Sequence, residues 1–183
     1  IPACQAYDPA FAYEVATIIK HGIERMYGAK PEDVFYYLTL YNENYEMPAR
    51  PEVEGIEEEI MSGLYKWQAA PGGKHRASIF FSGSAHGSAR RAAAELLEHY
   101  DVGADLWSAT SYKLLREDGL ETERWNRLHP LASPRKSRVE SILSESTGPI
   151  IAVSDFMRSV PLQISPYVGS RKFVALGTDG MGR

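Results

Sequence analysis

Apolar residues recur at helical spacing near the start of the chain, and they predict a helix over residues 9–27. We expect Asp8 to be its N-cap and Pro9 its first helical residue, because these residue types favour those positions. Gly28 then supplies a stop signal. The apolar positions on one face of this helix are Phe11, Val15, Ile18, Ile19, Ile23 and Met26.

A continuous β-branched and aromatic run over residues 34–41 follows and predicts a strand. Because apolar and polar residues do not alternate in it, we expect a strand buried on both faces, as in a parallel sheet. A helix that leads into such a strand is half of a βαβ unit. In open α/β sheets, ligands bind beyond the carboxyl ends of the strands. The polar loop 42–45 is therefore either a substrate-binding edge or a solvated exit loop.

Residues 47–76 are typical of a linker followed by the first elements of a second domain. Pro48 and Pro51 discourage regular structure at its start, and a short helix is expected over residues 55–64. Beyond this segment strands and helices alternate, which predicts an α/β fold with a mainly parallel sheet and helices on both faces. The expected strands are 77–81, 104–108, 150–153 and 173–176, and the clearest helix is 85–100.

Composition and charge limit the kinds of partner that we expect this chain to bind. The chain has 183 residues, 44% of them hydrophobic and 24% charged, which is ordinary for a soluble globular protein. A formal charge of −4 gives no electrostatic reason to expect binding to nucleic acid or to an anionic membrane. No apolar run approaches the roughly 20 residues of a membrane helix. Cys4 is the single cysteine, so no internal disulfide can form, and a reducing cytoplasm is the expected location.

The sequence contains only weak matches to the motifs of catalytic, nucleotide-binding or metal-binding sites. The turn "SGSAHGSA" at 82–89 could hold an anion on its free amides, but it matches no nucleotide-binding pattern, so close packing of strand against helix is expected. His86, His99 and His129 lack the spacing of metal ligands, and no metal site is predicted. The basic run "SPRKSR" at 133–138 indicates a solvated or interface surface rather than a nucleic-acid stripe.

Five runs carry a family resemblance: "YDPAFAYEVATII", "GIERMYG", "YYLTLYNENYEMP", "ATSYKLLREDGLETERWNRLHP" and "LGTDGMGR". Together they closely resemble the C-terminal part of the decarboxylating, acetyl-transferring components of pyruvate dehydrogenase complexes, of the homodimeric bacterial type. The resemblance covers essentially the whole chain. It implies a transketolase-like layout in which residues 1–46 end the pyrimidine-binding domain as a helix-strand remnant. Residues 47–76 are then a linker with first elements, and 77–183 are a truncated C-terminal α/β domain.

The resemblance implies a parent enzyme that decarboxylates pyruvate on thiamine diphosphate and Mg²⁺ and acetylates a lipoyl group. The implied partners are a second copy of the parent and a dihydrolipoyl acyltransferase core. The family's diphosphate motif and activating glutamate lie upstream of this segment, so no catalytic residue is assigned. No bound cofactor and no activity are expected for the chain alone. The start at Ile1 and the end on a glycine-rich loop fit a piece of a larger protein.

The resemblance also suggests that the loop after the last pyrimidine-domain strand shapes the substrate channel. The channel candidates are Asn42, Glu43, Asn44 and Glu46. Some family members carry a histidine where this chain has Glu46, so an acid-base role for Glu46 does not carry over. Two alternatives from other classes stay open: a non-catalytic interaction module, and a small nucleotide- or flavin-binding α/β protein that uses residues 82–89.

Overall fold

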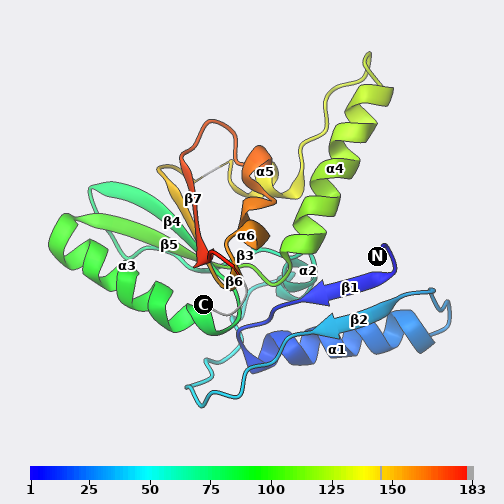
Figure 1. Cartoon of the computed structure of the whole chain (residues 1–183), viewed down its shortest axis with the longest axis horizontal. Coiled ribbons are helices and arrows are strands. Elements are labelled where there is room, and N and C mark those ends of the chain that lie inside the picture. The colour runs from blue at the N-terminus through cyan, green and yellow to red at the C-terminus, as the bar shows by residue number, and fades with distance from the viewer. Residues whose placement is uncertain (145, 181–183) are drawn as a thin grey trace.

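The structure is a computed structural model that describes residues 1–144 and 146–180. The last three residues of the "LGTDGMGR" run lie outside the described residues. The helices and strands, shown in Figure 1, are β1 (Cys4–Tyr7), α1 (Ala12–Tyr27), β2 (Phe35–Leu38), α2 (Ile56–Met61), β3 (Tyr65–Gln68), β4 (His75–Phe81), α3 (His86–Tyr100), β5 (Val102–Ser108), α4 (Tyr112–Leu128), α5 (Arg138–Ile142), β6 (Ile150–Met157), α6 (Ser159–Leu162) and β7 (Phe173–Thr178).

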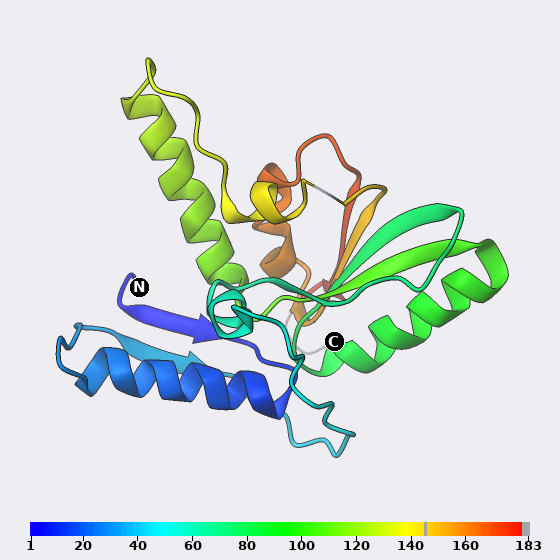
Figure 2. The same ribbon diagram turned by 180° about the vertical axis from the view of Figure 1, so that it is seen from behind.

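The larger sheet has five strands in the order β3-β5-β4-β6-β7. All neighbours pair in parallel except β3, which runs antiparallel to β5 at one edge. Helix α3 covers one face, while α4, α5 and α6 lie over the other, as the two opposite views show (Figure 1, Figure 2). The predicted α/β fold with a mainly parallel sheet is confirmed. Among the described residues, no helix is both long and apolar enough to cross a membrane.

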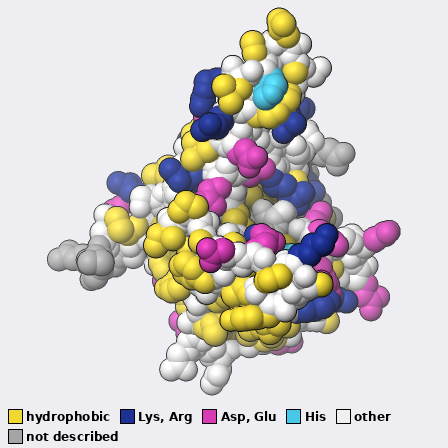
Figure 3. Space-filling model, turned by 90° about the vertical axis from the view of Figure 1, so that its right-hand side faces the viewer, with side chains coloured by type: hydrophobic (Ala, Val, Ile, Leu, Met, Phe, Trp, Pro, Cys, Tyr) yellow, Lys and Arg dark blue, Asp and Glu magenta, His cyan; other side chains and the backbone are white. Residues whose placement is uncertain are grey.

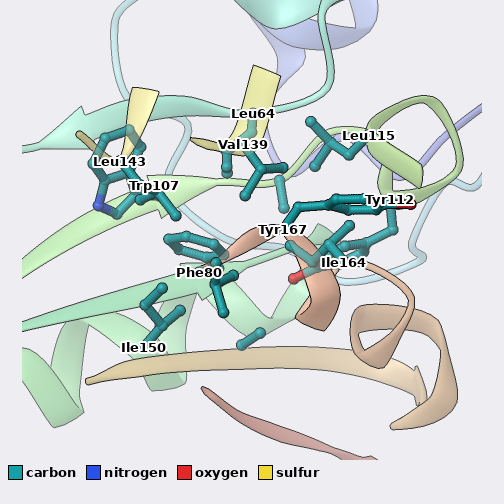
Figure 4. Packing of buried hydrophobic residues seen from close by; sticks show 13 residues of the cluster. Leu64, Phe80, Trp107, Tyr112, Leu115, Val139, Leu143, Ile150, Ile164 and Tyr167 are labelled. Carbon is teal, nitrogen blue, oxygen red and sulfur yellow. The ribbon is translucent and has the colours of Figure 1, made fainter. Parts of the chain in front are cut away.

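Alternation along the central strands divides the core between the two faces. On β4, Ile79 and Phe81 face α3, whereas Phe80 points to the opposite side. On β5, Leu106 and Trp107 divide in the same way. Figure 4 shows the core beneath α4, α5 and α6. Its labelled residues are Leu64, Phe80, Trp107, Tyr112, Leu115, Val139, Leu143, Ile150, Ile164 and Tyr167.

Strand β3 was not predicted from the sequence. It is four residues long, and its alternation of buried Tyr65 with exposed Lys66 is too short to stand out from a linker. Pairing with β5 gives it a place at the sheet edge. The predicted short helix before it is confirmed as α2, which buries Ile56 and Ile60.

A smaller parallel sheet of β1 and β2 packs beside the larger one. Helix α1 is the crossover connection from β1 to β2. The predicted helix and strand, half of a βαβ unit, are confirmed, and β1, which was not predicted, supplies the other strand. The predicted burial of β2 on both faces is wrong. Helix α1 covers only one face of the sheet, so Phe35 and Tyr37 point outward and are 47% and 58% exposed. Tyr36 and Leu38 face inward toward the buried cluster of Tyr7 and its neighbours.

The predicted start of the first helix is also wrong. Helix α1 begins at Ala12, with Phe11 in the N-cap position, rather than at Pro9. Asp8 instead continues the extended path of β1, where its N–H donates to the Thr110 carbonyl (2.8 Å). Its carboxylate is occupied by hydroxyl groups from the loop after β2. The predicted end is confirmed, because the Gly28 N–H donates to Glu24 (2.8 Å) and closes the helix.

Glu14 joins the small sheet to the large one. Its side chain is 0% exposed and accepts four hydrogen bonds. Two come from the N–H groups of Ala10 (2.6 Å) and Phe11 (3.1 Å), which cap α1. The other two come from the hydroxyls of Tyr65 on β3 and Ser108 on β5, each at 2.6 Å. Burial raises the pKa of the Glu14 carboxyl, and the hydrogen bonds from Ser108 and Tyr65 oppose that rise.

We expect Glu14→Ala to lower the free energy of unfolding by roughly 3–5 kcal/mol, since it leaves four buried donors without an acceptor. Glu14→Gln should lose much less, because the hydroxyls of Tyr65 and Ser108 can rotate to accept from the new amide. Urea unfolding followed by circular dichroism measures both changes. Equal losses in the two variants would contradict the hydrogen-bonding role.

The Glu14→Gln substitution also tests the raised pKa of the Glu14 carboxyl. Because the folded-state pKa of Glu14 is raised, the folded chain keeps this proton to a higher pH than the unfolded chain does. The contribution of Glu14 to stability is therefore full below the unfolded pKa and declines as the pH rises through the folded pKa. Urea titrations over a pH series should show this decline in the wild type relative to Glu14→Gln. A wild type that gains stability relative to Glu14→Gln over that range would contradict the raised pKa.

Candidate functional site

A cavity of about 440 Å³ opens at the carboxyl ends of β4 and β6. We call it the edge pocket. The connection that leaves β4 runs through α3, which covers one face of the sheet. The connection that enters β6 runs through α4 and α5, which lie over the other face. The crossover connections therefore change sides between β4 and β6. Ligands bind at such points in open α/β sheets. Its lining comes from three segments: Glu43 and Tyr45, residues 84–88 with Arg91, and residues 153–155.

Hydrogen bonds hold the loop after β2 against the connection between β1 and α1. The Tyr45 hydroxyl donates to the Ala10 carbonyl at 2.6 Å. Thr39 and Tyr41 both donate to one carboxylate oxygen of Asp8, at 2.6 and 2.7 Å. Asp8 is thus the anchor for this loop, and the position predicted as a helix cap serves the site instead.

The glycine of the turn after β4 is required by this loop. Gly83 has a positive φ of 50°, and a Cβ there would lie 2.4 Å from the Tyr41 ring. Its N–H also donates to the Asp8 carbonyl at 3.1 Å. We predicted that the turn serves close packing between its own strand and helix. The close approach that needs glycine is instead to Tyr41, which brings two distant segments together.

His86 begins α3 and forms the inner wall of the edge pocket. It is 5% exposed, and its ring lies 4.4 Å from the Tyr45 ring and 5.2 Å from that of Phe11. Within the described part of the chain, its Nδ1 atom has no hydrogen-bond partner. Burial and the positive charge of Arg90 lower the pKa of His86, while Glu43 acts in the opposite direction. The imidazole is therefore neutral near pH 7.

The four predicted channel residues differ in whether they reach the edge pocket. Asn42, Glu43, Asn44 and Glu46 are all exposed, but only Glu43 lines the edge pocket.

Of the residues that complete the wall, Tyr45 lies in the predicted polar loop 42–45 and His86 in the turn 82–89, whereas Arg91 and Asp155 belong to neither predicted segment. Asp155 follows the strand predicted at 150–153, so the rule that ligands bind beyond the carboxyl ends of strands points to it as well as to the loop after residues 34–41. For Arg91, no signal in the sequence distinguishes it from Arg90.

The edge pocket does not fit a magnesium diphosphate group. In residues 1–144 and 146–180, no three His, Cys, Asp or Glu side chains converge as metal ligands. Charge in the lining is mixed, since Glu43 and Asp155 accompany Arg91. A diphosphate would meet two carboxylates there, and their negative charge disfavours it.

Comparison with protein families accounts for nearly the whole chain. Residues 1–48 match the model described as "Pyruvate dehydrogenase E1 component middle domain". Residues 63–183 match "Transketolase-like TK C-terminal domain", and this match covers more than half of the chain. The chain belongs to the transketolase-like C-terminal domain family. The edge pocket therefore lies where the segment before this transketolase-like domain meets the domain itself.

Curated relatives agree with the predicted resemblance, which is confirmed. The pyruvate dehydrogenase E1 component of Escherichia coli is 46% identical over 183 residues, which is 100% of this chain and 20% of that protein. The one from Mycolicibacterium smegmatis is 48% identical over 182 residues, 99% of this chain and 19% of that protein. This chain thus spans about a fifth of the length of the curated relatives it matches.

Solved structures show the same fold. A split-gene transketolase, described as an inactive beta4 tetramer, superposes with a TM-score of 0.54 at 17% identity. The match covers 98% of this chain and 50% of that one. At this identity the likeness shows the transketolase-like fold alone.

The His86 imidazole offers a direct test of the edge pocket. We expect its NMR titration midpoint below the ordinary value of 6.5, because burial disfavours the charged ring. Glu43→Gln should lower the midpoint further, since it removes the carboxylate that favours protonation. The resonance is assigned by its loss in His86→Gln. A midpoint above 6.5, or one that rises in Glu43→Gln, would contradict this geometry.

Proposed function

We propose that this chain works as part of a pyruvate dehydrogenase E1 component that decarboxylates pyruvate on thiamine diphosphate and acetylates a lipoyl group. The observation that carries the proposal is the 46–48% identity to such components over essentially the whole chain. Thiamine diphosphate would supply the carbanion chemistry. The residues of this chain shape access to it, and we propose that the chain has no turnover by itself.

The proposal includes a division of the chain into three parts. Residues 1–46 are the end of the pyrimidine-binding domain, 47–76 are a linker with first elements, and 77–183 are the C-terminal domain. Support comes from the two family matches, which cover residues 1–48 and 63–183. The second match begins at residue 63, before the proposed boundary at residue 77. This earlier start is consistent with β3, which lies before residue 77 and pairs with the larger sheet.

The loop after β2 is the part of the chain that we assign to the substrate channel. Glu43 is supported by its place on the edge pocket, and Asn42, Asn44 and Glu46 by their exposure beside it. These groups form a polar wall that orients a small 2-oxo acid and its water. Asp8 and Tyr45 are positioning residues, because they fix this loop through the hydrogen bonds described above.

The surface of the β1–α1–β2 unit supports a place within a larger assembly. Phe35 and Tyr37 expose one face of the small sheet, and Ile19 and Ile23 are 47% and 55% exposed on α1. Figure 3 shows hydrophobic side chains gathered over the lower part of the molecule, where this unit lies. Exposed apolar side chains gathered on one unit in this way are typical of a contact with other protein. The parent's partners in this proposal are a second parent subunit and a dihydrolipoyl acyltransferase core, and its location is the cytoplasm.

The same exposed surface also favours the second candidate, a non-catalytic interaction module. Isothermal calorimetry of the chain with thiamine diphosphate and Mg²⁺, FMN and nucleotides should show no binding, because the described residues hold no metal cluster and the edge pocket carries carboxylates. Saturable binding of a nucleotide or flavin would favour the small ligand-binding protein instead.

A chimera separates the enzyme part from the interaction module. This chain replaces the corresponding 183 residues of the Escherichia coli relative, to which it aligns over its full length. We expect the chimera to retain turnover that depends on pyruvate and thiamine diphosphate, whereas the chain alone shows none. A folded chimera without turnover, or turnover by the chain alone, would contradict the proposal.

Glu43→Gln in the chimera tests the channel assignment. We expect kcat/KM for pyruvate to fall roughly tenfold, which corresponds to about 1.4 kcal/mol of lost transition-state stabilisation. Glu98→Gln, an exposed residue near the far end of α3, is the matched control and should leave kcat/KM unchanged. Equal values for the two variants would remove Glu43 from the channel.

A further inference from the structure

His86 lines the edge pocket, but the proposed function gives it no role. It begins α3 beside the loop that follows β2, as the two opposite views show (Figure 1, Figure 2). Three aromatic rings surround its imidazole, with centroids 4.4 Å away in Tyr45, 5.2 Å in Phe11 and 6.4 Å in Phe81. These contacts hold the imidazole in one orientation, so each of its two nitrogens has a fixed environment.

The two ring nitrogens of His86 have different surroundings. Nδ1 is closed off from solvent, and in residues 1–144 and 146–180 it has no hydrogen-bond partner. The described residues give Nε2 no hydrogen bond either, but this atom is not closed off from solvent. Because His86 lines the edge pocket, Nε2 is the nitrogen that meets the pocket.

The environment of Nδ1 decides which nitrogen carries the proton. A neutral imidazole has a single N–H. Nδ1 lies closer to the backbone than Nε2 does, and therefore closer to the free N–H groups of the first turn of α3, which carry partial positive charge. An N–H at Nδ1 would be repelled there and would find no acceptor. We therefore expect the proton on Nε2, where it forms a donor in the edge pocket.

Other donors line the same part of the edge pocket. Ser84 and Ser88 have hydroxyl groups there, and Arg91 follows one turn later on α3. Arg91 donates to the Ser88 hydroxyl at 3.3 Å, and among the described residues it has no ion pair. The rest of the lining includes the carboxylates of Glu43 and Asp155. One cation beside two carboxylates favours a ligand with no more than one negative charge.

We propose that His86 is a substrate-binding residue, whose Nε2–H donates a hydrogen bond to a carboxylate oxygen of a 2-oxo acid in the edge pocket. The negative charge of the acid faces the Arg91 guanidinium. No proton is transferred, because the neutral ring donates and keeps its proton. The identity of the acid rests on the proposed function, whereas the hydrogen bond itself requires only a monocarboxylate.

Nitrogen NMR tests the donor in the chain alone. Proton–nitrogen correlation spectra of isotope-labelled histidine, recorded above the titration midpoint of His86, distinguish the nitrogen that carries a proton from the bare one. We expect the proton on Nε2. Added pyruvate should shift the Nε2 signal and leave the exposed His99 at the other end of α3 unmoved. His86→Gln identifies the signals by their loss. A proton on Nδ1, or an Nε2 signal that pyruvate leaves unmoved, would overturn the proposal.

Two substitutions in the chimera separate hydrogen bonding from packing. His86→Phe keeps an aromatic ring against Tyr45 and Phe11 but removes the donor. His86→Gln loses the ring but keeps an N–H near the place of Nε2. We expect His86→Phe to raise KM for pyruvate roughly tenfold, which is the ordinary effect of losing one hydrogen bond to a charged group. His86→Gln should change KM little, kcat should change little in both variants, and His99→Phe is the matched control without effect.

The outcomes distinguish this inference from the proposed function. A raised KM in His86→Gln with a normal KM in His86→Phe would show that the ring serves packing alone, and would overturn the inference. Equal KM values in the two variants and the wild type would overturn it as well. A chimera without turnover contradicts the proposed function instead, and the response of Nε2 to pyruvate then decides the binding role. Those spectra use the wild-type chain, so they hold even if a substitution impairs folding.

Discussion

The structure depends on a single buried carboxylate at the junction of its two sheets. Glu14 lies on the first turn of α1, yet half of its hydrogen bonds come from Tyr65 and Ser108 of the larger sheet. A carboxylate that is fully removed from water must find its donors inside the protein. In the structure, these donors are reached by placing α1 against the β3–β5 edge, and this fixes the small sheet on the large one.

The candidate site is a consequence of that placement. Once α1 is fixed, Asp8 lies beside the turn after β4, where it holds Tyr41 over Gly83. The loop that follows brings Glu43 to the edge pocket and stacks Tyr45 on His86. The pocket therefore has walls from two family units, the pyruvate dehydrogenase middle domain and the transketolase-like C-terminal domain.

Two surfaces of the molecule are apolar, and they differ in kind. The outer face of the small sheet is broad and lies on a unit of only two strands. This is typical of a sheet that is extended by further strands or covered by other protein. The far end of α4 with the loop that follows it, residues 124–136, is small, projecting and held by stacked side chains. The first surface fits a domain contact, whereas the second is an exposed end held rigid by its own side-chain contacts.

The sequence alone determined the α/β class, the order of most elements and the family, because periodicity and characteristic runs such as "NENYEMP" are local properties. It placed a polar loop at the end of β2 but could not tell which side chain reaches the pocket. Only the tertiary structure decided that Glu43 lines it, that Asp8 anchors a loop instead of capping a helix, and that β2 is covered on one face. Each of these depends on which distant segment lies nearby. Hydrogen-bond partners and burial are set by packing between segments far apart in the chain, and no local pattern records that packing.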